Sequence, residues 1–206
     1  LVAFSVAIMA TAVLPLDSPI QVFSARQVNA QPPLPGNENE QQATQPTAQD
    51  RRIARLIARL MPINHISQMG LNDTVSERAL DLYVDRFDPM KLYFYQSDIN
   101  EFKRYENSID EMVKNGDLSL AYLIFNRFTD RVEERVDVAL ELLGGEFDFT
   151  KDEYIIVNPE AASYANSPEE ARDRWRKQIK YALLDLRDDE TEGEEARELL
   201  RRRYQR

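Results

Sequence analysis

The chain offers few side chains that could perform catalysis or bind a metal ion. His65 is the one histidine of the chain. The chain has no cysteine, and this absence excludes thiolate catalysis and any cysteine-ligated zinc or iron–sulfur site. A Ser-His-Asp triad would depend on this one imidazole, and a lone histidine that follows a helix is more often structural than catalytic. No GxSxG, phosphate-binding glycine loop or HExxH motif occurs. We therefore predict no catalytic, cofactor-binding or metal-binding residue in this chain.

Acidic side chains are numerous and raise the question of a carboxylate metal site. They include Asp85, Asp88, Glu133, Glu134, Asp188, Asp189 and Glu190. A four-helix di-metal site needs Glu-x-x-His pairs on facing helices, which a single histidine cannot supply. Carboxylates also alternate with arginines, in Asp130-Arg131, Glu133-Glu134-Arg135 and Arg172-Asp173-Arg174. We interpret these runs as solvated helix faces with i,i+3 and i,i+4 pairs, and a helical metal-binding enzyme as the weaker alternative.

The aromatic run Tyr93-Phe94-Tyr95 follows Met90 and Leu92 and has two interpretations. It lies between two expected helices, which favours a place in the core. The alternative is an exposed patch that docks another domain or a partner. Trp175 has the same ambiguity, and its position on a helical apolar stripe favours the core.

The elements that would hold these residues are helical, because the apolar spacing after Arg51 follows a helical period nearly throughout. We predict an all-α fold, an irregular bundle of about five to six helices around one central long helix. The first expected helix begins at Arg51, and Pro62 stops or bends it. The second runs through Val75 to Tyr83 and ends at the Asp88-Pro89 turn. The third runs from an N-cap at Ser97 to Gly116.

The central helix is expected from a cap at Asp117 to Leu143, before Gly144-Gly145. Its first half is apolar almost all round, which is typical of a helix buried on several sides, and Phe125 is expected in the core. A short strand over Tyr154 to Val157 is the one possible exception to the helical pattern, with no obvious partner. Further expected elements are a helix opened by the capping box Ser167-Pro168-Glu169-Glu170, and a last helix from about Glu194 that is unfinished at Arg206.

Composition and the first fifty residues bear on location and partners. The formal net charge of −10, with no long basic run, makes nucleic acid a poor partner. Residues 1–30 begin with an uncharged apolar stretch of 16 residues and contain the small-residue site Val28-Asn29-Ala30, so we expect an export signal whose start is truncated. The alternatives are a buried core helix and an uncleaved membrane anchor. Residues 31–50 are rich in proline and glutamine and are expected to form a disordered linker. The helical domain is expected over 51–206 and beyond.

Three stretches together resemble the N-terminal domain of bacterial tail-specific (carboxy-terminal-processing) serine proteases. They are LDLYVDRFDPMKLYFYQSDINEF at 80–102, EFDFTKDEYIIVNPE at 146–160, and RWRKQIKYALLDL at 174–186 with ELLRRRYQR at 198–206. Within the third, the residues that match the family's pattern are Trp175, Lys180, Tyr181, Leu200, Arg202, Arg203 and Tyr204.

The resemblance implies an exported, periplasmic protein in which a PDZ domain and a peptidase domain with a serine–lysine dyad follow this chain. It assigns no catalytic role to any residue here. The helical region would frame the protease core and dock a lipoprotein adaptor. Protein substrates would be partners only through the parent enzyme. The membrane would be involved only through the export segment. The alternative is a free-standing periplasmic helical scaffold or adaptor without enzymatic activity.

Overall fold

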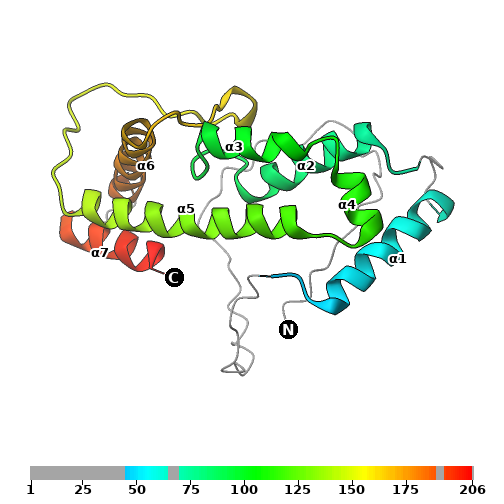
Figure 1. Cartoon of the computed structure of the whole chain (residues 1–206). Coiled ribbons are helices and arrows are strands. Elements are labelled where there is room, and N and C mark those ends of the chain that lie inside the picture. Colours follow the sequence, from blue (N-terminus) through cyan, green and yellow to red (C-terminus); the bar gives the residue numbers. More distant parts are fainter. Residues whose placement is uncertain (1–44, 65–69, 189–192, 206) are drawn as a thin grey trace. The chain divides into compact units, whose positions relative to one another are not determined.

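A computed structural model describes residues 45–64, 70–188 and 193–205, and over these residues the predicted all-α class is confirmed (Figure 1). They contain no strand and form seven α-helices rather than five to six, together with two short 3-10 helices. The elements are α1 (Ala48–Asn64), α2 (Asp73–Phe87), α3 (Gln96–Phe102), η1 (Lys103–Tyr105), α4 (Ile109–Asn115), α5 (Ser119–Leu143), η2 (Pro159–Ala161), α6 (Pro168–Asp188) and α7 (Gly193–Tyr204).

Helix α1 packs closely against α4, and a glycine makes this possible. Gly116 ends α4 with a φ of 71°, a left-handed conformation that favours glycine. A Cβ at this position would lie 2.7 Å from the main-chain carbonyl oxygen of Arg51 in α1. Ala54 and Ala58 are the buried side chains of α1, and their small size also allows a close approach. The helix continues two residues past Pro62, so this proline does not stop it.

The single helix expected from Ser97 to Gly116 is wrong, because the chain turns between two shorter helices. Helix α3 ends at Phe102, η1 follows, and α4 begins only at Ile109. The main-chain N–H of Asp110 donates to the Oγ of Ser76, a buried residue of α2, at 2.9 Å. This bond ties α4 across α2, a position that a straight continuation of α3 would not reach.

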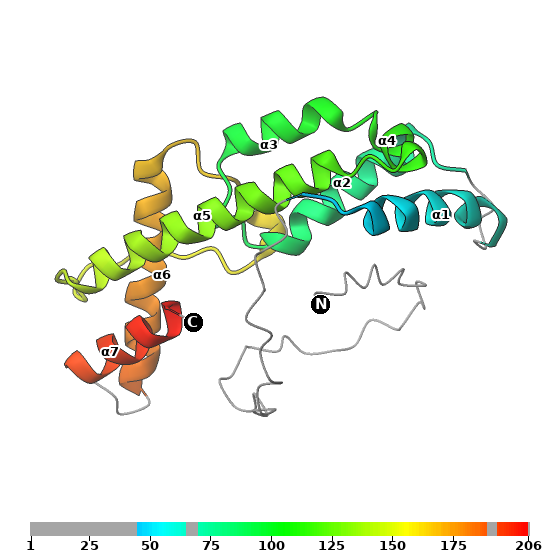
Figure 2. The ribbon, with the colours of Figure 1, turned by 60° about the horizontal axis from the view of Figure 1, so that its bottom comes forward.

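Helix α5 is the predicted central long helix, and Figures 1 and 2 show α2 and α3 beside its first half and α6 and α7 beside its second half. The N-cap residue is Leu118 and not Asp117 as expected, although Asp117 accepts from the main-chain N–H of Ser119, the first residue of the helix, at 2.9 Å. Phe125 is only half-buried, which corrects its expected place in the core, because Ile124 takes the innermost position on this turn.

Two hydrophobic clusters share α5. The first cluster joins its beginning to α2 and α3, and the second joins its end to α6 and α7. The buried residues of the first are Leu80, Val84, Phe94, Ile99, Phe102, Leu120 and Ile124. Those of the second are Ala139, Leu143, Trp175, Ile179, Leu183, Ala196 and Leu200.

The strand considered at Tyr154–Val157 does not form, and the segment is extended and largely exposed between α5 and α6. Several other expectations concern residues outside the described ranges. They are the export segment at 1–30, most of the linker at 31–50, and the residues His65, Asp189 and Glu190. Within the linker range, Ala48 already begins α1, and Thr47 and Asp50 exchange hydrogen bonds at its start.

Candidate functional site

The chain between α2 and α3 is held by one buried carboxylate, Asp88. Its oxygens accept from the main-chain N–H groups of Leu92, Tyr93 and Phe94 at 2.7, 2.9 and 2.9 Å. Burial raises the pKa of Asp88 above its usual value, although these three donors and the nearby Arg135 act in the opposite direction. Because three consecutive N–H groups converge on one side chain, the conformation of residues 88–94 is fixed without any regular secondary structure.

The aromatic run that follows this carboxylate belongs to the core. Phe94 is completely buried, and its ring lies 5.6 Å from that of Phe102 in an edge-to-face contact. Tyr95 is also buried, and the ring of Tyr93 packs 5.5 Å from that of Trp175. The interpretation of these residues as core is confirmed, and the alternative of an exposed docking patch is wrong.

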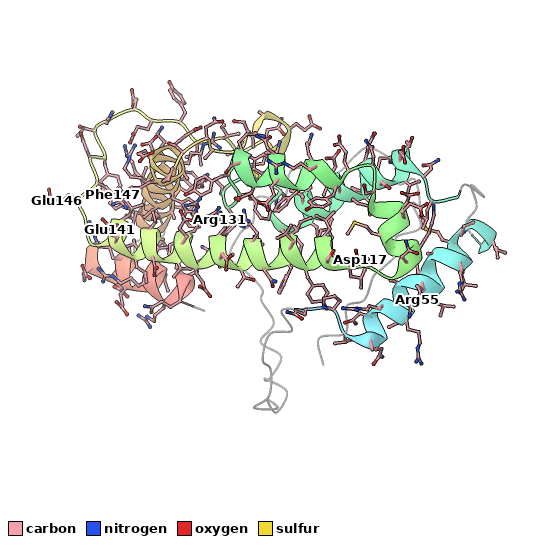
Figure 3. The ribbon with its side chains drawn as sticks, viewed as in Figure 1. Arg55, Asp117, Arg131, Glu141, Glu146 and Phe147 are labelled. Atoms are coloured by element: carbon pink, nitrogen blue, oxygen red, sulfur yellow. The ribbon has the colours of Figure 1, made fainter. Side chains whose placement is uncertain are left out.

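Asp98 is the centre of a charged cluster between α3 and α5, here called the Asp98 cluster, which comprises Asp98, Arg127, Arg131, Glu134 and Arg135. Asp98 accepts from Arg127 at 2.5 Å and from two nitrogens of Arg131 at 2.9 Å. Arg131 also donates to Glu134 at 2.9 Å. Figure 3 labels Arg131 in the middle of α5, where its side chain extends from the helix toward α3.

Tyr95 packs against the arginines on the inner side of the cluster. The guanidinium groups of Arg131 and Arg135 both lie 4.5 Å from the centre of the Tyr95 ring. Arg135 is only 1% exposed and donates to the Tyr95 hydroxyl at 3.0 Å and to the Tyr93 carbonyl at 3.1 Å. The prediction that this arginine lies on a solvated helix face is therefore wrong, because tertiary partners satisfy its charge and its donors.

The electrostatics of the cluster favour structure over catalysis. Burial alone would raise the pKa of Asp98, but hydrogen bonds from Arg131, the Tyr95 main-chain N–H and Arg127 outweigh it and lower this pKa. The carboxylate is thus held ionised with its oxygens occupied by donors. A general acid or base needs a pKa near the working pH and access to a substrate, and Asp98 has neither.

The residues that match the family pattern lie in the second cluster or at its edge. The indole N–H of Trp175 donates to the main-chain carbonyl of Leu92 at 3.0 Å. The centre of the Tyr204 ring lies 5.9 Å from the centre of the Trp175 ring. Lys180 is buried and donates at 2.8 Å to Glu153 and at 2.8 Å to the Lys151 carbonyl. These contacts fasten α6 and the end of α7 to the segments that surround them.

Of the other matched residues, Leu200 is buried in the second cluster. Tyr181, Arg202 and Arg203 are exposed. The matched set is therefore mainly a set of packing contacts around α6.

A groove of about 240 Å³ lies between α6 and the extended segment that precedes it. Met90, Leu92 and Ala162 contribute apolar surface, and residues of α6 such as Asp173 and Lys177 form one wall. The opposite side is lined by residues 154–156. The lining of this groove is more apolar than polar, which suits an apolar polypeptide side chain.

The described residues contain neither a metal-binding cluster nor a membrane-spanning helix. No group of three or more histidine or acidic side chains comes together there in a way that could hold a metal ion. No helix among them is both long enough and apolar enough to cross a lipid bilayer.

Sequence reasoning missed the Asp98 cluster and the role of Asp88. The sequence indicates only a turn at Asp88-Pro89 and a solvated helix face at Arg131 and Arg135. A usable signal was present for the first, since an aspartate before a loop often accepts main-chain N–H groups. No local pattern could have identified Asp98 as the partner of two arginines about thirty residues away.

Comparison with known proteins adds the following findings. The model of the tail specific protease N-terminal domain family matches residues 56–206. A tail-specific protease from Haemophilus influenzae is 30% identical over 142 residues, which cover 68% of this chain and 20% of that relative. The match thus spans about a fifth of the length of this curated relative.

Proposed function

Because this chain belongs to the family of tail-specific protease N-terminal domains, we propose that it is the non-catalytic helical scaffold of a protease that trims or degrades proteins from their C-termini. The parent enzyme is exported, periplasmic and serine-type, and its PDZ and peptidase domains lie outside this chain. The whole protease activity belongs to those domains.

The observation that carries this proposal is how the charged and aromatic side chains of the matched region are used. Asp88, Asp98 and Lys180 are buried, and each is held by several protein donors or acceptors. A scaffold needs polar contacts of this kind because they fix the positions of helices relative to one another. A catalytic group would instead need an open position for the substrate.

The proposed location and partners rest on the sequence. The apolar stretch in residues 1–30 supports export, with the membrane involved only through that segment. The protein substrates would meet the PDZ and peptidase domains first, and a lipoprotein adaptor would dock on the helical region. The net charge of −10 argues against nucleic acid as a partner.

The direct test compares this 206-residue chain with the full-length gene product in cleavage of a peptide that has an apolar C-terminal tail. We expect cleavage by the full-length protein and none by the 206-residue chain. Cleavage by the shorter chain alone would contradict a non-catalytic role. A reading frame that ends at Arg206 would favour the free-standing adaptor instead.

A second test separates scaffold from catalyst within this domain. Lys180→Gln in the full-length protein removes the buried ammonium, and Lys177→Gln is the matched control on the more exposed side of the same helix. We expect both variants, compared at a temperature where each is folded, to keep the cleavage rate within about twofold. If Lys180→Gln alone lowers the cleavage rate about a hundredfold or more with unchanged helix content, the lysine has an effect of the size expected for an acid–base catalyst, which would contradict the scaffold role.

A further inference from the structure

The extended segment at residues 154–157 has the composition of a β-strand but the surroundings of an exposed surface. Tyr154 is 87% exposed, Ile156 46% and Val157 75%. β-branched and aromatic residues of this kind favour extended pairing, and an exposed apolar run is unusual on a free surface. In Figures 1 and 2 this part of the chain runs as an open ribbon beside α6.

The segment is fastened to α6 at its start and ends in a local turn. Before it, Glu153 accepts from Arg176 at 3.0 Å and from Lys180 at 2.8 Å. After it, the main-chain carbonyl of Asn158 accepts from the N–H of Ala161 at 3.1 Å in a 3-10 turn. Glu153 holds the start of the segment against α6, and the turn that begins after Asn158 ends it, so the four residues between them follow an open path beside this helix.

The backbone of this segment has free hydrogen-bonding capacity. Within the part of the chain that the structure describes, no hydrogen bond from another protein group reaches the main-chain N–H and C=O groups of residues 154–157. A row of open donors and acceptors is complementary to another extended polypeptide, which can add to it as a strand. The groove of about 240 Å³ beside α6 would receive side chains of such a strand.

We propose that residues 154–157 are an open strand edge to which an extended segment of the same polypeptide, from the protease portion, adds as a second strand beside the α6 groove. This inference rests on the proposed function. The curated relative is about five times as long as the region it shares with this chain, so a large further portion is available to supply the strand.

Two physical arguments favour the same polypeptide over other occupants. A pair of four-residue segments buries far less than the roughly 1,200 Å² that a stable complex of separate molecules needs, whereas a linked segment benefits from a high effective concentration. An edge kept open for substrates would also leave three apolar side chains exposed in the resting enzyme, which is an aggregation hazard.

Hydrogen–deuterium exchange of the amides at 154–157 tests the proposal in the 206-residue chain and in the full-length protein. We expect exchange in the resting full-length protein to be at least about tenfold slower, because paired amides are protected. Ile156→Asp in the full-length protein should return exchange toward the rate of the shorter chain. Leu82→Asp, on an exposed position of α2, is the matched control and should leave the exchange unchanged.

Equally fast exchange in both resting proteins would overturn the proposal. Protection that appears only with an added protein substrate, or only as protein concentration rises, would also overturn it in favour of a substrate or a second copy. If the full-length protein cleaves the apolar-tailed peptide while the segment exchanges fast, the strand edge is wrong and the proposed function stands. A reading frame that ends at Arg206 would contradict both the proposed strand pairing and the proposed function.

Discussion

Replacing Asp98 by asparagine removes the negative charge at the centre of the contact between α3 and α5. The carboxylate is 1% exposed and accepts from Arg127, from two nitrogens of Arg131 and from the main-chain N–H of Tyr95. Asparagine has nearly the same shape, so the change leaves no cavity. Its amide can still accept from Tyr95, but its NH₂ group faces a guanidinium donor.

The size of the effect follows from the burial of the partners. Removing one partner of a fully buried ion pair costs about 3–5 kcal/mol, because a charge is left without compensation. Arg127 and Arg131 are each about a quarter exposed, so water regains access to them and reduces the loss. We therefore expect Asp98→Asn to lower the free energy of unfolding by about 2–3 kcal/mol at pH 7.

The same pair gives a pH dependence with a definite sign. The pKa of Asp98 is lower in the folded chain than in the unfolded chain, so its contribution to stability is fully present above the unfolded pKa of about 3.9. The contribution is lost as the pH falls from about 5 through the folded pKa. Asparagine does not titrate, so the difference between the two proteins should shrink over this range.

Urea-induced unfolding followed by circular dichroism measures both effects on the 206-residue chain. Glu141→Gln is the matched control, because Glu141 forms an exposed pair with Arg172 and should leave the midpoint nearly unchanged. A loss below about 1 kcal/mol for Asp98→Asn at pH 7, or a loss that does not shrink at low pH, would refute the reasoning.

Three further predictions follow from burial and hydrogen bonding. Phe94→Ala should lower the free energy of unfolding by about 3–5 kcal/mol in denaturant titrations, and Phe125→Ala, which truncates a half-buried ring, by only about 1–2 kcal/mol; equal losses would mean that the core lies elsewhere. Trp175→Phe removes an indole donor and should cost about 1–2 kcal/mol in the same assay, whereas no loss would mean that water replaces this bond. Arg176 and Lys180 lower the pKa of Glu153 to about 2, so its stabilising effect is present above about pH 4.5 and is lost as the pH falls toward 2. Glu153→Gln should therefore speed chymotrypsin cleavage after Tyr154 in the 206-residue chain at pH 7, and an unchanged rate would mean that the anchor is unimportant.

Local signals in the sequence were sufficient for several elements. Asp117 and Gly144 bracket α5, although Leu118 is its N-cap, because capping and the glycine stop act within one or two residues. The Oγ of Ser167 accepts from the main-chain N–H of Glu170 at 3.2 Å, which is one half of the predicted capping box. The other half differs, because the Glu170 carboxylate accepts from the main-chain N–H of Asn166. The aromatic run was assigned to the core because it lies between two amphipathic helices.

Other features depend on contacts between distant residues and could not be predicted from spacing. The break between α3 and α4 depends on Ser76, which lies 34 residues before its partner Asp110. The burial of Arg135 depends on carbonyl groups about 40 residues earlier. A β-rich run such as 154–157 becomes a strand only when a second strand is available, and none exists in the described ranges.

The position of Arg135 has a mechanical consequence for the domain. Helix α5 is roughly 37 Å long at 1.5 Å per residue, and its two ends belong to different apolar clusters. Hydrophobic attraction has no preferred direction, whereas hydrogen bonds to fixed carbonyl groups weaken steeply when donor and acceptor are displaced. Because Arg135 bonds to carbonyl groups of the chain between α2 and α3, a load applied at either end of α5 meets a stiff point between the two clusters.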